Sequence, residues 1–490
     1  MAEKFPRDIN ESIGQFQLVE ADETPVSDVR TGTLRLENKT ADLEVSPEMT
    51  PSIQWEQRED GSWVGHSSES EQADFTVIGT LSHSPSEVSL WRTNTTSRRT
   101  LGLAIPGQDS PGNQKMRSDW CITGAHLADP TLPFSTVYFD IANLHEWSGY
   151  SYTSEHITVK NKNGLPHTWT LDFPESEALP LKNGEGTLEF SARANAAPRS
   201  ARGFRVSTNT FVKIDLEDGL SLDDLVAQYG RPLALLMTIL AGKESSIRAI
   251  ELRGPDNRSL AAYGKIVDRE APTSPGQLFL TRRDVSVDLV TTWLSTAVAL
   301  SPVPEILASL WSGAFPFIET RSLTLATTAE ALHRLLHPDA RRFTTQEIDE
   351  SISGLADSTM PETVKSSLHD ALSSYWMEKS YPQRIEELAE PVAKAVPTCI
   401  GKLNRWKRAV SNLRVQLAHG FSDQEPEPQK ILEAEALSRS LLWMLTFRLL
   451  LHSGVTATEL RNAAENSERY QLDMRRWNKQ WPKIFSSENT

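Results

Sequence analysis

The first half of the chain alternates between apolar and polar residues over short runs that are separated by turn residues. Period-two alternation of this kind is typical of strands that bury one face. Eight such runs before residue 218 predict a β-rich domain with a sandwich-like or barrel-like arrangement. The runs are "GTLRLE" (32–37), "DFTVIGTL" (74–81), "DWCITGA" (119–125), "STVYFDI" (135–141), "HITVKN" (156–161), "TWTLDF" (168–173), "GTLEFSA" (186–192) and "NTFVKIDL" (209–216).

Turn residues lie between these runs. The pair Asn163-Gly164 separates two of them and is a strong signal for a hairpin turn. The stretch "PGQDSPGNQKMRS" (106–118) carries glycine and proline near its start, and its composition predicts a loop.

The pattern changes at residue 221, where helical periodicity begins. Ser221 with Asp224 three residues later is an arrangement typical of a helix N-cap. A helix is predicted to run from there to about Gly242, with Pro232 kinking or splitting it.

One more strand and a long helical region complete the pattern. "SSIRAIELRG" (245–254) predicts a strand, and "REAPTSPGQ" (269–277) predicts a linker or exposed loop. Beyond residue 285 the apolar spacing is helical. The predicted helices cover 286–300, 303–313, 319–337, 345–354, 362–377, 382–395, 398–419, 429–453 and 456–478.

Together these patterns predict an α+β chain with more than one domain, as expected for 490 residues. Residues 1–218 form the predicted β-rich domain. Residues 219–284 form a mixed helix and strand connector. Residues 285–490 form an all-α bundle.

The predicted helix 398–419 has a well-defined apolar stripe. Its members recur at spacings of three and four: Leu403, Trp406, Val410, Leu413 and Leu417. Because each residue turns the helix by about 100°, the stripe fixes the direction of every other side chain. The far face carries Arg408, Asn412, Val415 and His419, flanked by Arg405 and Gln416, while Arg414 lies on the shoulder of the stripe.

Charge is distributed unevenly along the chain. The net charge of −15 argues by itself against nucleic-acid binding, because phosphate contacts need positive side chains. Between Glu390 and Asp423, however, there is no acidic residue. A basic run is commonly a solvated helix face, but it also suits a phosphate-binding surface. The run comprises Lys394, Lys402, Arg405, Lys407, Arg408 and Arg414.

The sequence indicates a cytoplasmic protein without membrane spans. The opening "MAEKFPRDINESIGQF" is polar and lacks the apolar segment of a secretory signal. The longest apolar runs, 231–242 and 289–304, are too short or are broken by prolines. Two cysteines, Cys121 and Cys399, provide no disulfide framework, which favours a reducing compartment.

The end of helix 398–419, "NLRVQLAHGFSD" (412–423), raises two interpretations. His419 followed by Gly420 fits an ordinary helix C-terminus, where a histidine interacts favourably with the helix dipole. Arg414 and His419 also fit a pair of groups that act on phosphate. Five residues apart, they differ by about 140° around an ideal helix, so a second copy of the helix across a two-fold axis would bring two pairs together.

These residues resemble the HEPN superfamily, whose nuclease members carry Arg-x4–6-His at a helix end in an all-α bundle. "LRVQLAHG" matches Arg-x4-His, with a small residue before the histidine and glycine after it. Upstream, "RSLTLATTAEALHRLLHP" (321–338) is similar to the first long helix of such a bundle, and it contains Glu330.

The N-terminal half resembles the β-rich domain of ApeA-type bacterial anti-phage proteins. The resemblance rests on "VIGTLSHSPSEVSL" (77–90) and especially on "CITGAHLADPTLPFSTVYFDIANLHEWSGY" (121–150). A strand, a "GAHF"-like turn and an "L-x-E-W" end follow one another in that order. The two resemblances together cover nearly the whole chain.

The resemblance implies an anti-phage ribonuclease of the abortive-infection type that needs neither metal nor other cofactor. His419 would be the general acid or base, and Arg414 would hold the phosphate. Asn412, Gln416 and Glu330 would be auxiliary residues. Arg405, Arg408 and Lys402 would bind flanking phosphates without reading sequence. The implied partners are RNA, with tRNA as one candidate, a second copy of the chain in an even-numbered oligomer, and a phage-derived trigger.

One departure from the nuclease pattern keeps a second hypothesis open. Nuclease members often carry a polar residue directly after the arginine, and here it is Val415. Asn412 or Gln416 could supply the missing hydrogen bond. Otherwise the bundle would be a catalytically silent module that dimerises or binds RNA. A zinc site at His333 and His337, a phosphate loop at "AGKESS" (241–246) and base stacking on Trp477 and Trp481 are less favoured.

Overall fold

The computed structural model describes most of the chain in a series of ranges. They are 11–37, 39–50, 53–67, 74–83, 86–100, 112–149, 154–159, 166–172, 176, 178–182, 184–196, 206–254, 256–269, 277–315, 317–418 and 428–485. The chain folds into two compact units. The β-rich unit comprises residues 1–237 and 245–275, and the helical unit comprises residues 238–244 and 276–490.

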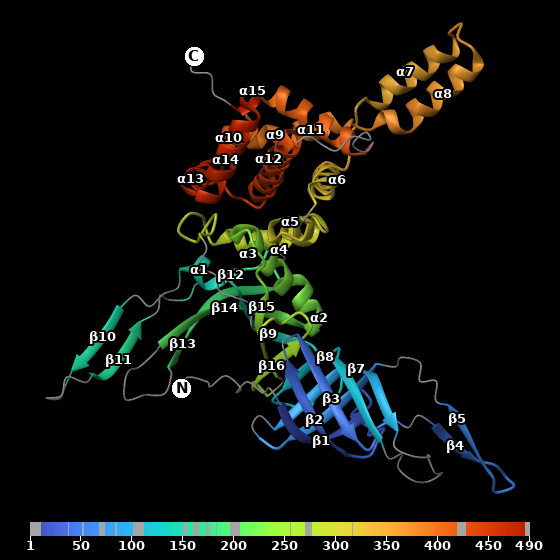
Figure 1. Ribbon diagram of the computed structural model, residues 1–490, viewed down its shortest axis with the longest axis vertical. Coiled ribbons are helices and arrows are strands. Elements are labelled where there is room, and N and C mark those ends of the chain that lie inside the picture. Colours follow the sequence, from blue (N-terminus) through green and yellow to red (C-terminus); the bar gives the residue numbers. More distant parts are fainter. Residues whose placement is uncertain are drawn as a thin grey trace. The chain divides into compact units, whose positions relative to one another are not determined.

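The β-rich unit is built on one large antiparallel sheet and two separate two-stranded ribbons (Figure 1). Most inward positions along the strands are apolar, which is the alternation that defines half-buried strands. The strands are β1 (Glu11–Val19), β2 (Arg30–Glu37), β3 (Thr40–Ser46), β4 (Ile53–Gln57), β5 (Trp63–Ser67), β6 (Phe75–Leu81), β7 (Glu87–Thr100), β8 (Gly112–Thr123), β9 (Phe134–Ile141), β10 (Ser154–Val159), β11 (Pro166–Asp172), β12 (Ala178–Pro180), β13 (Gly186–Ala196), β14 (Val206–Leu220), β15 (Ile247–Arg253) and β16 (Ser259–Gly264).

Part of the large sheet closes into a barrel. The strand order is β12-β13-β14-β9-β15-β16-β8-β3-β2-β1-β6-β7, and β7 also pairs with β8. The six strands from β8 to β7 therefore form a closed ring, and the remaining six extend from it as an open sheet. Closure removes free edges from the barrel portion.

The barrel core depends on close packing around Phe16. This side chain is fully buried on β1, and its direct partner on β6 is Gly79. A Cβ atom at position 79 would lie 2.4 Å from the Phe16 ring, so only glycine leaves room for it. The cluster around it includes Leu18, Leu34, Leu43, Val77, Val88, Leu90 and Met116.

Helical segments accompany the open part of the sheet. Ser221 caps α2, its hydroxyl accepting a hydrogen bond from the Asp224 backbone N–H, as predicted. The helix is interrupted by a π-helical stretch just before Pro232. These segments are α1 (Leu144–Ser148), α2 (Leu222–Leu225), the π-helical η1 (Val226–Gly230) and α3 (Arg231–Ala241).

The helical unit is a bundle around a long buried helix, α12. Buried residues occur on nearly every side of α12, as expected for a helix that other helices surround. The helices are α4 (Asp288–Ala299), α5 (Val303–Ser312), α6 (Ile318–Leu336), α7 (Thr345–Ala356), α8 (Glu362–Ser373), the 3₁₀ turn η2 (Tyr375–Met377), α9 (Tyr381–Ala395), α10 (Pro397–Ile400), α11 (Leu403–Ala418), α12 (Pro428–His452), α13 (Ala457–Asn466), α14 (Glu468–Gln480) and α15 (Pro482–Phe485).

Aromatic rings fill the centre of this bundle. Trp443 on α12 makes an edge contact with Trp311, with ring centroids 4.7 Å apart, and another with Tyr470 at 5.2 Å. Edge-to-face pairs of this kind are favourable beyond the area that they bury. The bundle therefore has a rigid aromatic core on which the outer helices are placed.

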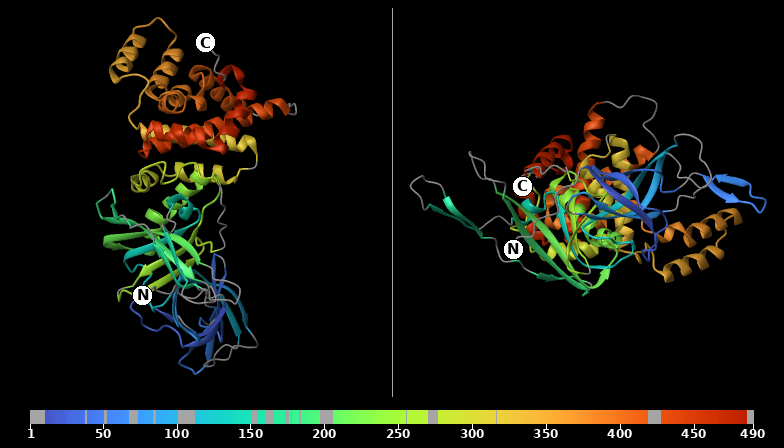
Figure 2. Two further views of the ribbon diagram at one scale, coloured as in Figure 1. Left: turned by 90° about the vertical axis from the view of Figure 1, so that its left-hand side faces the viewer. Right: turned by 90° about the horizontal axis from the view of Figure 1, so that it is seen from below.

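Helices α7 and α8 form a hairpin that extends from the rest of the helical unit (Figures 1 and 2). Within them only Ile348 and Ala371 are buried. A capping box at Thr344, with Glu347 as its third helical residue, starts α7. The hairpin is thus stabilised largely by its own two helices.

The predicted fold class is confirmed: an N-terminal β-barrel with additional strands is followed by a helical region. The boundaries proposed at residues 218 and 284 stay predictions. The predicted linker 269–277 and the Asn163-Gly164 turn lie largely outside the described residues, although β10 and β11 do pair as a hairpin.

Several local predictions are wrong in detail. Residues 112–118 belong to β8 and not to a loop. The alternation of apolar and polar residues did not indicate this strand, because the polar Gln114 occupies a buried, inward-facing position. Its buried amide is fully used, since Oε1 accepts from the Met49 backbone and Nε2 donates to Thr95 Oγ1. Helix 398–419 is broken at Gly401, where a Cβ atom would lie 2.3 Å from the Ile484 carbonyl oxygen.

Two other helix boundaries also differ from the prediction. The predicted helix 456–478 is two helices, because Ser467 caps α14. Helix 362–377 ends at Ser373 and continues as a 3₁₀ turn.

No described helix is by itself long and apolar enough to cross a bilayer. Helices α4 and α5 meet that criterion only when taken together, and the chain bends by 107° between them.

We predict that Phe16→Ala destabilises the β-rich unit by about 3–5 kcal/mol, because it leaves a cavity that Gly79 cannot fill. Ile13, on the same strand, has 60% of its surface exposed, so Ile13→Ala should change the unfolding free energy by less than about 0.5 kcal/mol. Urea unfolding followed by circular dichroism measures both. Equal effects of the two variants would contradict the barrel core described above.

Candidate functional site

Helix α11 carries the candidate site, and its orientation follows from the apolar stripe. Trp406, Val410 and Leu417 are buried, and Leu403 and Leu413 are half-buried. The predicted stripe is therefore confirmed. The residues predicted for the opposite face are exposed: Arg405, Arg408, Asn412, Val415 and Gln416.

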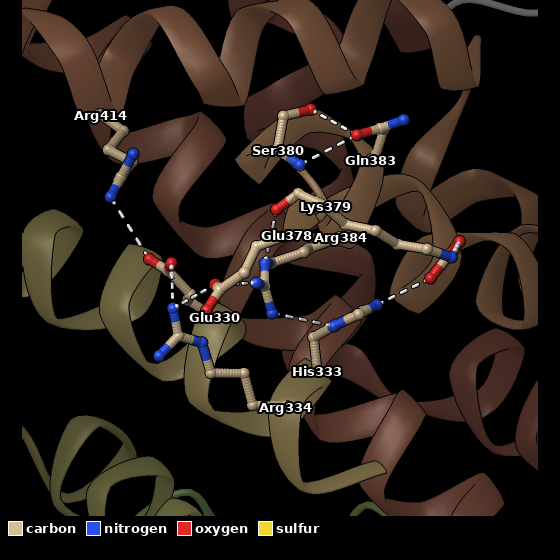
Figure 3. A network of polar contacts seen from close by, with 10 residues as sticks. Glu330, His333, Arg334, Glu378, Lys379, Ser380, Gln383, Arg384 and Arg414 are labelled. Carbon is tan, nitrogen blue, oxygen red and sulfur yellow. Dashed lines mark hydrogen bonds and ion pairs between the residues drawn. The ribbon is translucent and has the colours of Figure 1, made fainter. Parts of the chain in front are cut away.

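Arg414 leaves the shoulder of α11 and meets two other helices (Figure 3). Its Nη2 donates to Glu330 Oε2 on α6 at 3.3 Å. Its guanidinium carbon lies 4.6 Å from the centre of the Tyr381 ring at the start of α9. The side chain keeps 41% of its surface exposed. Arg414 is thus held by an ion pair and a cation–π contact, while part of its donor fork faces solvent.

Glu330 belongs to a larger network of charges. Its second oxygen, Oε1, lies 3.5 Å from Arg334, which also reaches Glu378 Oε2 at 2.9 Å. Arg384 donates to the same Glu378 oxygen at 2.7 Å. Figure 3 shows these alternating charges running from Arg414 towards His333. The carboxylate that holds Arg414 is therefore itself fixed by a neighbouring arginine.

His333 lies at the buried end of the network. Its Nε2 donates to Glu387 Oε2 at 2.7 Å, and its Nδ1 faces Arg384 Nη1 at 3.4 Å. Because an arginine can only donate, Nδ1 acts as the acceptor and the ring is neutral. Burial lowers the pKa of His333, against the opposing effect of Glu387. Hydrogen bonds from His333 and Lys379 outweigh the burial of Glu387 and hold the pKa of its carboxyl below the usual value.

A groove of about 800 Å³ runs along the exposed face of α11. Three helices form it: α11, the first turns of α12, and α15. Its walls combine cationic side chains with an apolar floor, and one acidic residue is present. The lining residues are Arg405, Arg408, Ala409, Asn412, Leu413, Val415, Gln416, Lys430, Glu433, Ala434, Leu437, Trp481, Lys483 and Ile484.

The predicted site residues fall into three groups. Arg414 and Glu330 are brought into contact. Arg405, Arg408, Asn412 and Gln416 share the groove, whereas Lys402 precedes α11 and does not line it. His419 and Gly420 lie outside the described residues.

The pairing state of the basic residues differs within the groove. Arg405 Nη1 donates to the Lys483 carbonyl oxygen at 3.0 Å. Arg408 makes neither an ion pair nor a side-chain hydrogen bond with any part of the chain that the structure describes. Arg408 is thus the arginine of α11 most available to an incoming anion.

Sequence reasoning missed Tyr381, Lys430 and Lys483. Tyr381 is the first residue of α9 and Pro382 follows it. Nothing local indicates that its ring supports an arginine from another helix. Lys430 lies at the start of α12, the next helix along the chain, and Lys483 lies on α15, so the helical spacing of α11 indicates neither of them. Trp481 also lines the groove, and its Nε1 donates to the Glu433 carbonyl oxygen at 2.9 Å. Trp477 is fully buried in the bundle, so it offers no exposed face on which a base could stack.

Two family models match the chain. Residues 11–294 match the model described as ApeA N-terminal domain 1, and residues 323–459 match the model described as Apea-like HEPN. The fold and the matches together define a protein with a β-barrel domain followed by a HEPN bundle. The first family model alone matches more than half of the chain, and the chain therefore belongs to the ApeA family. Neither a curated protein nor a solved structure matches it.

We predict that acid weakens the helical unit through His333. An unfolded histidine takes up a proton below about pH 6.5, but the folded ring resists it because its pKa is lowered. The unfolded state therefore binds more protons, and stability is lost as the pH falls from 6.5 through the lowered pKa. His333→Gln should flatten this part of the dependence of the unfolding free energy on pH.

The matched control is His369→Gln. His369 is exposed on α8 and lies outside the charge network of His333, so the comparison of the two variants isolates the effect of that network. His452 contributes in the same direction as His333, since burial lowers its pKa as well. Because His452 remains in His333→Gln, this variant should lose only part of the pH dependence of the unfolding free energy. A curve between pH 7.5 and 5 that His333→Gln does not alter would contradict the neutral, buried state of this ring.

Proposed function

We propose that this chain is an anti-phage ribonuclease that cleaves RNA without a metal ion through Arg414 and His419. The observation that carries the proposal is the Apea-like HEPN match over residues 323–459. That region contains both members of the Arg-x4-His motif, together with Glu330.

The proposed reaction is a transesterification within the RNA strand. The ribose 2′-hydroxyl attacks the adjacent phosphorus as its proton passes to a base. The bond from phosphorus to the 5′-oxygen breaks as that oxygen receives a proton. The products are a 2′,3′-cyclic phosphate and a 5′-hydroxyl. His419 serves in one of these proton transfers, since an ordinary histidine titrates near neutral pH.

Arg414 holds the phosphate and stabilises charge that develops on its non-bridging oxygens. Its geometry supports this role, because Glu330 and Tyr381 fix the guanidinium while 41% of the side chain stays exposed. Glu330 is then a positioning residue that acts through Arg414. Asn412 and Gln416 are exposed on the same helix and are proposed to orient the phosphate or the ribose.

The basic groove is the proposed path of the RNA strand. Arg405 and Arg408 line it with Lys430 and Lys483, so four cationic side chains lie along the proposed path. Lys402 precedes the same helix and is proposed to bind a phosphate further along. Such contacts hold the backbone and leave the choice of sequence to other features. A tRNA loop is one candidate substrate.

Two further parts of the proposal rest on the family relationship. HEPN domains usually dimerise, so two chains would each contribute one Arg414 and His419 pair to a shared cleft. The β-rich domain would sense a phage-derived trigger and restrain the bundle until it is bound.

A second candidate function is a catalytically silent HEPN module that only dimerises or binds RNA. Val415 favours it, because this apolar residue follows the arginine directly and has 52% of its surface exposed. An exposed valine adds no hydrogen bond to a phosphate. The two candidate functions differ in one observable product: the ribonuclease generates new 2′,3′-cyclic phosphate ends, and the silent module does not.

We predict that His419→Ala and Arg414→Ala each abolish protection against phage and the cleavage products. Loss of a general acid or base commonly lowers a rate by about 10²–10⁴-fold. The measurements are plaque formation in cells that produce the protein, sequencing of 2′,3′-cyclic phosphate ends in cellular RNA, and cleavage by the purified chain.

The control for this experiment is His369→Ala, which removes an exposed histidine of α8 outside the groove. It should protect cells as the unaltered chain does. Protection that persists in His419→Ala, with no new RNA ends in either protein, would support the silent module instead.

We also predict that Arg405→Gln and Arg408→Gln weaken RNA binding and its dependence on salt. Each lost phosphate contact should lower the slope of log K against log salt by about 0.7 for a single strand. Fluorescence anisotropy with a labelled RNA, measured in the His419→Ala background, gives both quantities. Lys394→Gln is the control, because Lys394 pairs with Glu390 at 2.9 Å outside the groove. If the slope of log K against log salt is unchanged in the double arginine variant, RNA does not run through the groove.

A further inference from the structure

One face of the open sheet in the β-rich unit carries a polar cluster that the proposed ribonuclease does not use. Residues that pair directly in antiparallel strands point to the same face. Asp140 on β9 pairs with Phe211 on β14 and with Ala249 on β15. Asn209 lies two residues from Phe211 and therefore shares this face, which places an amide beside the Asp140 carboxyl.

A β-bulge brings an arginine onto this face. The register of β15 against β9 shifts between Ile247 and Ala249, which leaves Arg248 as the extra residue. Bulges re-aim side chains and are common beside functional sites. Arg248 donates to Asp140 Oδ1 from Nε at 3.0 Å and from Nη2 at 2.6 Å. The bulge thus creates a paired carboxylate and guanidinium in the middle of the sheet.

Asp140 and Arg248 are largely buried, but some of their hydrogen-bonding atoms have no partner among the described residues. The Asp140 side chain is 8% exposed and that of Arg248 is 14% exposed. Both hydrogen bonds end on Oδ1, so Oδ2 of Asp140 accepts none from the described residues. Within the same described ranges, Nη1 of Arg248 and the side-chain amide of Asn209 also have no partner. Burial raises the pKa of Asp140 against the effect of Arg248, and perturbed carboxyls of this kind cluster at functional sites.

These unused groups meet at a pocket of about 250 Å³. Asp140, Asn209 and Arg248 line it. Tyr263 and Arg269 form a further wall, with the guanidinium carbon of Arg269 5.3 Å from the centre of the Tyr263 ring. The rest of the lining is small and apolar: Ala249, Ile250, Ala261, Ala262 and Val267. An apolar pocket with a few convergent polar groups is the usual form of a small-molecule site.

A second buried ion pair stiffens the same face. Arg193 Nη1 donates to Glu251 Oε2 at 2.5 Å, and Glu251 is 2% exposed. The Arg193 guanidinium carbon also lies 4.7 Å from the ring centres of both Tyr138 and Phe211. The sheet beside the pocket is therefore held by charges and rings, which limits the reorganisation needed when a ligand binds.

We propose that this pocket binds a nucleobase, presented either by a free nucleoside or nucleotide or by one flipped-out base of an RNA strand. Nη1 of Arg248 donates to an exocyclic carbonyl oxygen or to an unprotonated ring nitrogen of the base, and Oδ2 of Asp140 accepts from a neighbouring ring or amino N–H. The Asn209 amide supplies one donor and one acceptor beside them. The Tyr263 and Arg269 wall offers a surface for stacking.

The charges in the pocket select this class of ligand over simple ions. A free anion would approach the Asp140 carboxylate, and a free cation would approach Arg248 and Arg269. A neutral planar group with a donor beside an acceptor satisfies both members of the pair. The pocket is slightly smaller than the ~300 Å³ at which sites for drug-sized ligands begin, so it takes one base and excludes a folded peptide.

The test is isothermal titration of the purified full-length chain with adenosine, guanosine, cytidine and uridine, and with ribose as the sugar control. At least one nucleoside should bind with one site per chain, and ribose should not bind. Asn209→Ala and Asp140→Asn should each weaken that binding by about tenfold or more, since each removes a hydrogen bond in a buried site.

Asp215→Asn is the matched control for Asp140→Asn. Asp215 accepts from Thr136 Oγ1 at 2.7 Å on the same sheet face but does not line the pocket, so its replacement should leave the affinity unchanged. Asn209→Ala keeps the proposal testable if Asp140→Asn does not fold, because Asn209 makes no side-chain hydrogen bond to the described residues.

Two arms identify the source of the base. Tighter binding of a nucleoside monophosphate than of the nucleoside favours a free nucleotide, and tighter binding of a short oligoribonucleotide favours RNA. The oligonucleotide arm uses the His419→Ala chain so that cleavage does not intervene. The proposal is overturned if no nucleoside binds, or if the binding is the same in Asn209→Ala, Asp140→Asn and the unaltered chain. Neither result bears on the proposed ribonuclease, whose residues lie in the helical unit.

Discussion

A buried hydrogen bond between α11 and α12 determines how the candidate site is presented. Trp406 is fully buried, and its Nε1 donates to Ser440 Oγ at 2.9 Å. Ser440 in turn donates to the Cys399 carbonyl oxygen at 2.7 Å. A buried indole N–H without a partner would cost about 1–3 kcal/mol, so α11 cannot rotate about its axis without losing this bond. The direction of every other side chain on α11 follows from that restriction.

The contrast between the two faces of α11 is a consequence of the same restriction. The stripe around Trp406 faces an aromatic core that leaves little room for rearrangement. The opposite face presents Arg408 and its neighbours to a groove with an apolar floor. Arg414 lies between these two environments, and a carboxylate and a ring from two other helices hold it. Three helices therefore meet through one arginine, although only α11 carries the motif.

The sequence predicted features that depend on local spacing. The stripe of α11, the exposure of Asn412 and Gln416, and the N-cap at Ser221 all follow from residues within one or two turns. The strand β1 (Glu11–Val19) was missed because its inward positions include Ser12 and Gly14, which dilute the alternation.

Contacts between distant segments could not be predicted from spacing. Glu330 and Arg414 are 84 residues apart, and their association was expected from a family resemblance alone. The break at Gly401 and the ring of Tyr381 beneath Arg414 depend on tertiary contacts that leave no local signal. The paired charges of Asp140 and Arg248 were missed for the same reason, since a bulge rather than a sequence pattern joins them.

The base and the tip of the α7–α8 hairpin should differ in how well they tolerate insertions and deletions. At its base, Arg342 donates its backbone N–H to the Met377 carbonyl oxygen at 2.8 Å, and Glu378 joins two arginines of the charge network. Beyond that base the two helices bury almost nothing against the bundle. Paired turns could therefore be added or removed at the tip at little cost to folding. An insertion or deletion of paired turns at the tip is therefore compatible with the contacts of Glu330 and Tyr381 that hold Arg414.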